Sequence, residues 1–371
     1  MLRKFKVSNF KSFEKDFELD LTDANGYEFN KNSIKDGVVN NAIIYGQNGV
    51  GKSNLAFAIF DIIEHLTDKQ RNEDMYKNYL NAHLDEEYAQ FYYEFLINSK
   101  VVIYEYKKTD YKTIVYERFL IDGKELALFD RTTSENAIVR FKGAEMLKTE
   151  IGNPELSILK YIKNNTELDR NGENDIFNLF FTFVEKMLYF RSLRENMYQG
   201  LHLGGWNIFE DIVNRGNVLD FETFLNRAGI ECKLATISDN GTNNIAFNFE
   251  SKLIPFIEVA STGTVALALF YFWFQKIKES NMVSFIFVDE FDAFYHHALA
   301  VLIVEKLKET GVQFILTTHN TSIMTNDLLR PDCYFTMTKK QIRSFSNSTE
   351  KELREAHNIE KMYKAGSFDV D

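Results

Sequence analysis

The sequence is poor in cysteine and proline, and it has no apolar run long enough to cross a membrane. It contains two cysteines, Cys232 and Cys333, and three prolines among 371 residues. Two distant cysteines without metal-ligand spacing exclude a disulfide framework and are typical of reduced, buried thiols. The longest apolar stretch, Val265 to Phe274, is much shorter than the roughly 20 residues of a membrane helix, and no signal-peptide pattern follows Met1. We therefore expect a soluble, cytoplasmic protein with no membrane partner.

Basic residues are in the minority. The chain has 43 lysines and arginines against 54 aspartates and glutamates, which gives a formal charge of −11. An acidic total argues against tight, unaided nucleic-acid binding over the whole surface, but it leaves room for a local basic groove. Two basic clusters, Lys107-Lys108-Lys112 and Lys339-Lys340-Arg343, are interpreted first as solvated surface turns. Apolar residues make up 45% of the chain, enough for a large core divided among two or three lobes.

One glycine-rich stretch fits the phosphate-binding loop pattern GxxxxGK[ST]. Ala42–Tyr45 before it has the pattern of a buried strand, and apolar residues after it recur at helical spacing, so the strand–loop–helix context is present. Glycines let backbone N–H groups turn toward a phosphate, and the helix adds its positive dipole end. We expect Lys52 to bridge the β- and γ-phosphates and the Ser53 hydroxyl to hold Mg²⁺. The predicted nucleotide-binding residues are Gly46, Gln47, Asn48, Gly49, Val50, Gly51, Lys52, Ser53 and Asn54.

A second group of motifs lies in the last third of the chain. Ser284–Val288 is a continuous apolar run followed by Asp289 and Glu290, as expected of a buried parallel strand whose carboxyl end reaches the ligand edge of a sheet. We expect Asp289 to hold Mg²⁺ through water and Glu290 to polarise the attacking water. Without the upstream phosphate loop, a core strand ending in solvated acids would explain the pattern equally well. The strand Gln313–Thr317 then leads to His319, which strand order brings to the same edge.

Ser261-Thr262-Gly263-Thr264 stands directly before the apolar helix Val265–Phe274. Its ordinary role is an N-cap, in which a hydroxyl satisfies the free amides of the first turn. The same hydroxyl and N–H donors also suit a γ-phosphate. The residues alone leave both interpretations open.

Taken together, these motifs resemble the ABC-type ATPase superfamily. The order matches: a phosphate loop with Asn48-Gly49, a long insertion, a signature at 261–264, the Walker B pair Asp289-Glu290, a D-loop at 291–296 and the switch residue His319. The opening Asn9-Phe10-Lys11-Ser12-Phe13 looks like the SMC and RecF branch. The stretches Thr317–Asn320 and 359–368 are similar to prokaryotic AAA family ATPases related to overcoming-lysogenisation-defect and abortive-infection ATPases.

The resemblance implies an α/β fold, namely an ABC-type P-loop ATPase head with a mixed or parallel sheet, an antiparallel β-subdomain and a helical insertion. We expect residues 1–75 and 245–371 to form the ATPase core. A β-meander should occupy 88–145, and the helical insertion should occupy 150–240. The signature is not the transporter-type LSGGQ, and no glutamine-loop residue is assigned.

The resemblance also implies how the sites assemble. Members of the superfamily bind two ATP molecules between two heads. Ser261, Gly263 and Thr264 would then contact the γ-phosphate held by the partner, and Asp292 would lie at the dimer seam. Because one chain carries one set of motifs, the implied unit is at least a homodimer that uses ATP and Mg²⁺.

We therefore expect a homodimeric switch or scaffold that binds and slowly hydrolyses ATP under the control of a trigger or partner, in prokaryotic anti-phage defence. The stretch after His319 is too short for the Toprim nuclease that some relatives carry, so the expected effector is a separate Toprim-like or HNH-like nuclease or toxin. One alternative is a RecF-like DNA-repair ATPase that clamps DNA. Another is a scaffold module that binds nucleotide without hydrolysing it.

Overall fold

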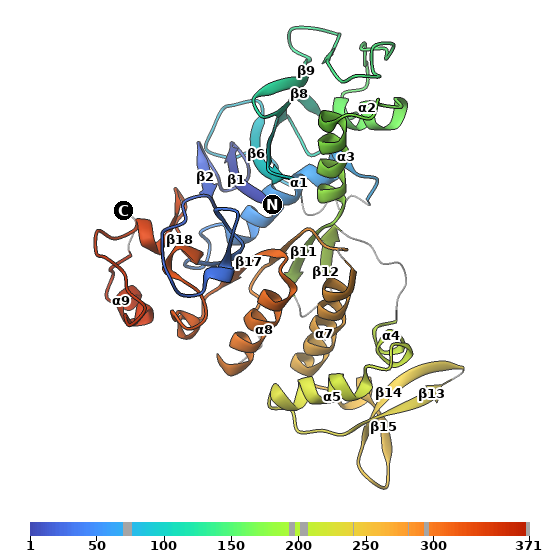
Figure 1. Ribbon diagram of the computed structural model, residues 1–371, viewed down its shortest axis with the longest axis vertical. Coiled ribbons are helices and arrows are strands. Elements are labelled where there is room, and N and C mark those ends of the chain that lie inside the picture. The colour runs from blue at the N-terminus through green and yellow to red at the C-terminus, as the bar shows by residue number, and fades with distance from the viewer. Residues whose placement is uncertain are drawn as a thin grey trace.

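The computed structural model describes residues 1–69, 76–192, 197–200, 207–239, 241–280, 282–292 and 297–368. Within these ranges the chain forms two seven-stranded sheets, a three-stranded sheet and a two-stranded pair of β3 (Ile34–Lys35) and β4 (Val38–Val39). In Figure 1 the first sheet lies at the top, the second in the middle and the three-stranded sheet at the bottom.

The first sheet is antiparallel, with the order β10-β9-β8-β7-β6-β1-β2. Its strands are β1 (Leu2–Ser8), β2 (Phe17–Asp20), β6 (Ala89–Ile97), β7 (Lys100–Lys108), β8 (Ile114–Ile121), β9 (Lys124–Asp130) and β10 (Ile138–Val139). Buried and half-buried residues alternate along β6 and β7, so one face of the sheet is fully covered. The turns from β6 to β7 and from β8 to β9 have left-handed backbone at Asn98, Ser99, Asp122 and Gly123.

Helix α1 (Lys52–Leu66) lies between the two large sheets and is buried on almost every side. Toward the first sheet, the Tyr93 hydroxyl donates to the carbonyl of Ala58 over 2.8 Å. Toward the second sheet, the Phe60 ring packs 6.0 Å from the Phe285 ring. Helix α3 (Gly172–Glu185) covers the same face of the first sheet, where the Phe180 ring lies 5.1 Å from Phe119. The short helix α2 (Ile158–Asn165) precedes it.

The second sheet is mixed, with the order β12-β11-β16-β17-β5-β18-β19. Its strands are β12 (Met197–Gly200), β11 (Met187–Ser192), β16 (Phe285–Val288), β17 (Gln313–Thr318), β5 (Asn41–Tyr45), β18 (Tyr334–Met337) and β19 (Ile342–Ser344). The five central strands are parallel, and β12 and β19 are antiparallel edges. Strands β5, β16, β17 and β18 are buried along their whole length, which explains their continuous apolar runs.

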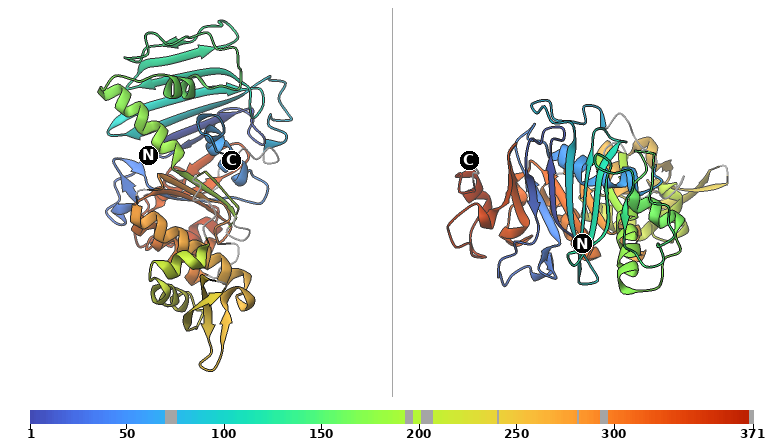
Figure 2. Two further views of the ribbon diagram at one scale, coloured as in Figure 1. Left: turned by 90° about the vertical axis from the view of Figure 1, so that its right-hand side faces the viewer. Right: turned by 90° about the horizontal axis from the view of Figure 1, so that it is seen from above.

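Helices α7 (Thr262–Ser280) and α8 (His297–Thr310) lie beside the second sheet, where the Trp273 ring packs 5.5 Å from Phe190 of β11. Figure 2 shows the resulting layers from the side. A small lobe follows at the far end, built from α4 (Ile208–Asn214), α5 (Val218–Arg227), β13 (Leu234–Asp239), β14 (Thr242–Asn248), β15 (Leu253–Pro255) and α6 (Phe256–Val259). Helix α9 (Ile359–Lys364) is the last helix of the described chain.

Two local expectations differ from the structure. The range 150–240 is not helical throughout, because Met187–Ser192 forms β11 and extends the second sheet beside β16. The apolar pattern of 253–259 predicts a strand, but β15 ends at Pro255 and the next four residues form the single turn of α6. None of the described helices is long and apolar enough to cross a lipid bilayer.

Candidate nucleotide-binding site

The phosphate-loop sequence connects β5 to α1 at the carboxyl edge of the second sheet. Gly49 and Gly51 adopt positive φ angles of 79° and 104°, which favour glycine. Gly46 is constrained by space, because an added Cβ would lie 2.7 Å from the carbonyl oxygen of Met337. Gln47, Asn48 and Gly49 are exposed, whereas Val50 is buried beneath them. The loop therefore presents accessible backbone at the start of a long helix, as a phosphate site requires.

Lys52 folds back over this loop. Its ammonium donates to the carbonyl of Gly46 over 2.9 Å and to that of Gln47 over 3.3 Å, and it lies 2.9 Å from His319 Nε2. Burial lowers the pKa of Lys52, and the carboxylates of Asp289 and Glu290 oppose that shift. An anion at the loop would relieve this cost, since it would offer the ammonium a charged partner.

Three side chains from three neighbouring strands meet beside Lys52. Asp289 follows β16, Thr317 lies at the end of β17, and Ser53 follows β5 by way of the loop. The Ser53 hydroxyl donates to Asp289 Oδ2, and the Thr317 hydroxyl donates to Asp289 Oδ1 over 2.6 Å. The three side chains lie close together because β16, β17 and β5 are parallel neighbours, so their carboxyl ends share one edge of the sheet. Burial raises the pKa of Asp289, and hydrogen bonds from the two hydroxyls act in the opposite direction.

This donor set fits a magnesium ion accompanied by a nucleotide. Ser53 and Asp289 supply a hydroxyl and a carboxylate, the hard oxygen ligands that Mg²⁺ prefers. Across the described ranges, no group of three or more histidine, cysteine, aspartate or glutamate side chains forms a metal cage. A protein that offers Mg²⁺ only one or two ligands relies on phosphate and water oxygens for the others.

Glu290 and His319 face each other at the rim of the site. Glu290 Oε1 lies 3.8 Å from His319 Nε2, and the two side chains are 55% and 39% exposed. The Glu290 backbone has a left-handed φ of 45°, and its N–H donates to the Thr317 hydroxyl over 2.8 Å. Burial and the charge of Lys52 lower the pKa of His319 from its ordinary value, which favours the neutral imidazole. The pair is therefore accessible to a ligand and contains an ionisable base.

Asp292 is directed into the protein instead of toward solvent. It is 8% exposed, and both carboxylate oxygens accept from the Thr318 hydroxyl, over 2.7 and 2.8 Å. Burial raises its pKa. The last four residues of the expected D-loop, 293–296, lie outside the described residues. The expected place of Asp292 at a dimer seam stays a prediction.

The segment expected as a signature caps α7. Ser261 Oγ accepts from the N–H of Thr264 over 3.1 Å and lies 2.8 Å from the Thr264 hydroxyl, which is the geometry of an N-cap. Thr264 is buried, whereas Ser261 and Thr262 are exposed and Gly263 is half-buried. Among the described residues, the side-chain hydrogen bonds of Ser261 stay within this segment. The structure thus brings the phosphate loop, Asp289, Glu290 and His319 together, but does not join Ser261–Thr264 to them.

Two residues of the site were not anticipated. Thr317 links Asp289 to the backbone of Glu290, and Ser12 accepts from the Asn54 amide over 2.9 Å. Ser12 also stands where a side chain at Gly51 would lie, 2.6 Å from its Cβ position. The signal for Thr317 was a hydroxyl at the end of a buried strand. Ser12 has no such local signal, because it reaches the loop from the turn after β1.

Comparison with known proteins gives one family and several structures. Residues 206–325 match the family described as an AAA domain, putative AbiEii toxin, Type IV TA system. No curated protein matches the chain significantly. An SMC head bound to the C-winged helix domain of ScpA aligns at 19% identity with a TM-score of 0.46, covering 92% of this chain and 96% of that one. The Thermotoga maritima SMC head domain aligns at 17% identity with a TM-score of 0.41, covering 92% and 98%. The recombination mediator RecF with ATP aligns at 14% with a TM-score of 0.41, covering 93% and 99%.

The matched range contains the segment before α7, the Asp289-Glu290 pair and His319. The phosphate loop lies outside that range and meets Asp289 and His319 at the edge of the second sheet. The mixed sheet and the antiparallel subdomain have the predicted α/β architecture. Residues 206–325 are thus similar to the AAA domain of that family.

Proposed function

We propose that the chain binds ATP with Mg²⁺ at the carboxyl edge of the second sheet and hydrolyses it slowly as part of a homodimer. The observation that carries this proposal is the contact of Ser53 with Asp289 beside Lys52, with Glu290 and His319 at the rim. A phosphate loop, a carboxylate at the end of a neighbouring strand and an accessible acid are the parts that phosphoryl transfer to water requires.

Each residue has a distinct proposed role. The N–H groups of the loop and the Lys52 ammonium bind the phosphates, and Ser53 and Asp289 hold Mg²⁺, which supplies charge neutralisation when bound. The Glu290 carboxylate accepts a proton from the attacking water. Neutral His319 donates a hydrogen bond near the γ-phosphate, and Thr317 positions both Asp289 and the Glu290 backbone. Thr317 acts through its neighbours and is a positioning residue.

We further propose that Ser261, Gly263 and Thr264 contact the nucleotide held by a second copy of the chain. The exposure of Ser261 and Thr262 at the start of a 19-residue helix supports this role, because a helix N-terminus attracts phosphate. The resemblance to two-headed ATPases supplies the arrangement. Each chain then carries one phosphate-loop half-site and one Ser261–Thr264 half-site. ATP binding brings each half-site against the complementary half-site of the second copy.

The Ser261→Asp variant separates the capping role from the phosphate-binding role. Aspartate caps a helix about as well as serine, so the fold should be kept, while its charge would repel a γ-phosphate. If Ser261 faces the nucleotide of the second copy, we expect turnover to fall by about 10²-fold or more, with the melting temperature unchanged. Wild-type turnover in Ser261→Asp would show that the residue only caps α7.

Mixing two inactive variants tests the assembly in trans. Lys52→Ala destroys the loop but keeps Ser261, and Ser261→Asp does the reverse. In a one-to-one mixture half of the dimers are mixed, and one of their two sites is intact, so about a quarter of wild-type turnover should return. Turnover that stays at the sum of the separate variants would contradict a shared site.

The biological role proposed is a switch in prokaryotic anti-phage defence that controls a separate effector nuclease or toxin. The description of the matching family supports the defence role. Plaque counts on cells that carry the chain with its effector should rise when Glu290→Gln or Lys52→Ala replaces the wild type. Equal plaque counts with all three proteins would remove the defence role while leaving the ATPase proposal intact.

A further inference from the structure

The small lobe at the far end of the molecule carries an unusual amount of exposed apolar surface. Eight large apolar side chains are exposed in the described chain, and four of them fall within eleven consecutive residues. These four are Phe249 (56% exposed), Leu253 (46%), Ile257 (59%) and Val259 (49%). We call residues 249–259 the apolar segment. Exposed apolar side chains gathered in this way mark an interaction site in a folded protein.

The apolar segment is folded, so its exposure does not come from a missing local core. Its first residues turn from β14 into β15, where the N–H of Phe249 donates to the carbonyl of Lys252 over 2.9 Å. Its own buried anchor is Phe256, whose ring stacks on Phe247 at 4.9 Å and lies 5.7 Å from Phe221 of α5. Because Phe256 already fills the side of the segment that faces the core of the lobe, the four exposed side chains are not needed to pack that core.

The segment also leads directly to the proposed shared site. Val259 is two residues before Ser261, and both Ser261 and Thr262 are exposed. In Figures 1 and 2 the strands of this lobe project at one end of the molecule, opposite the first sheet. Two residues of chain span at most about 7 Å, so whatever contacts Ser261 must also come close to Val259.

We infer that the apolar segment docks on a second copy of this chain when ATP is bound. The inference rests on the proposed function, in which Ser261 completes the nucleotide site of the other copy. Since that site is incomplete in one chain, the second copy must cover Ser261 and the residues beside it. Burial of Ile257, Val259 and their neighbours would then supply apolar area that polar contacts to phosphate do not provide.

The composition of the segment disfavours a nucleic-acid partner. Its charged residues are Glu250, Lys252 and Glu258, so acidic groups outnumber basic ones. Binding to a phosphate backbone depends on lysine and arginine and would gain little here. An effector protein is the remaining alternative occupant, and the experiment below distinguishes it from a second copy.

The test places two charges on the segment in a protein that holds ATP. Ile257→Asp and Val259→Asp are introduced together into Glu290→Gln, and the dimer dissociation constant is measured by analytical ultracentrifugation with ATP and Mg²⁺. We expect the constant to rise at least 30-fold, since two charges would have to be buried at the interface. Affinity for ATP at low protein concentration and the melting temperature should not change, because both side chains are exposed in the single chain.

A matched control is Met146→Asp, which changes the most exposed of the eight apolar residues, at 97%, on the loop after β10. It should leave the dimer constant unaltered. An unchanged constant in Ile257→Asp/Val259→Asp would overturn the inference, as would an intact dimer that no longer retains a co-purified effector. If Glu290→Gln itself forms no ATP-dependent dimer, the proposed function fails and the inference fails with it.

Discussion

A buried ion pair attaches helix α1, which begins in the phosphate loop, to the antiparallel sheet. The side chains of Asp61 and Lys108 are both fully buried, and Lys108 Nζ lies 2.7 Å from Asp61 Oδ1. Asp61 also accepts from the hydroxyls of Tyr106 (2.9 Å) and Tyr79 (3.0 Å). In Lys108→Met, the Asp61 carboxylate keeps these two donors but loses its counter-charge. Leaving one member of a buried pair uncompensated costs about 3–5 kcal/mol of unfolding free energy.

That cost can be converted into a melting temperature. At an unfolding entropy of about 2.1 cal/mol/K per residue, a chain of this length should melt roughly 4–6 °C lower. Differential scanning calorimetry of Lys108→Met measures this shift. The double variant Asp61→Asn/Lys108→Met should melt above Lys108→Met, because it removes the unpaired charge.

The matched control is Lys100→Met, which breaks the exposed pair of Lys100 with Asp122 (53% and 43% exposed). Its melting temperature should equal that of the wild type, since solvent-exposed ion pairs contribute little to the free energy of unfolding. A Lys108→Met variant as stable as the wild type, or a double variant less stable than the single one, would refute the reasoning.

Three further predictions concern the site itself. Thr317→Val removes the hydroxyl that holds Asp289 and the Glu290 backbone, so steady-state kinetics should show kcat reduced by about 10- to 100-fold with the fold preserved. Ser53→Ala should raise the Mg²⁺ concentration for half-maximal ATP binding by at least ~10-fold in a fluorescent-nucleotide titration, because it removes a hydroxyl ligand. Burial and the charge of Lys52 lower the pKa of His319 from its ordinary value, so turnover should be flat at neutral and mildly alkaline pH and fall as acid protonates the residue. The pH–rate profile of His319→Gln should lack this fall in turnover at acid pH. If the variant and the wild type show the same fall, a group other than His319 causes it.

The parts of the candidate nucleotide-binding site could be predicted from sequence because their signals are local. Each motif can be recognised from a few consecutive residues: the glycine-rich loop, the apolar run before Asp289 and the strand before His319. The rule that parallel strands end at one sheet edge then brings them together, and the structure does so. The match over 206–325 to the family described as an AAA domain, putative AbiEii toxin, agrees over that range with the expected relation to abortive-infection ATPases.

Features that depend on distant partners were missed. Lys108 was interpreted as part of a solvated turn, but it is buried against Asp61, 47 positions earlier in the chain. Strand β11 lies in a range rich in helix-spaced phenylalanines, and only its pairing with β16 makes Leu188 a strand residue. Neither partner could be inferred from neighbouring residues.

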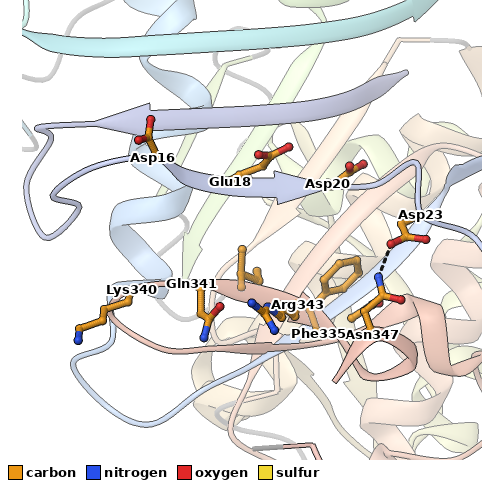
Figure 3. Close-up of a pocket in the computed structure, with 11 residues that line it drawn as sticks. Asp16, Glu18, Asp20, Asp23, Phe335, Lys340, Gln341, Arg343 and Asn347 are labelled. Atoms are coloured by element: carbon orange, nitrogen blue, oxygen red, sulfur yellow. Dashed lines mark hydrogen bonds between the residues drawn. The ribbon is translucent and has the colours of Figure 1, made fainter. Parts of the chain in front are cut away.

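The surface hollow between the two large sheets was also beyond sequence reasoning. It has a volume of about 500 Å³, and its walls are formed by the edge strands β2 and β19. In Figure 3, Asp16, Glu18 and Asp20 lie along one wall and Arg343 along the other. Glu18 and Asp20 are already paired with Lys6 and Lys4. The hollow exists only because two sheets far apart in the sequence end beside each other.

The claim that Glu290 activates water in an ATP-assembled dimer is tested most directly by Glu290→Gln. Mass in solution and phosphate release are recorded together for the wild type and the variant, with and without ATP and Mg²⁺. The account predicts that ATP drives dimerisation of both proteins, that phosphate release from Glu290→Gln falls by about 10²-fold or more, and that its dimer persists. A variant with wild-type phosphate release, or a mass indifferent to ATP in both proteins, would contradict it.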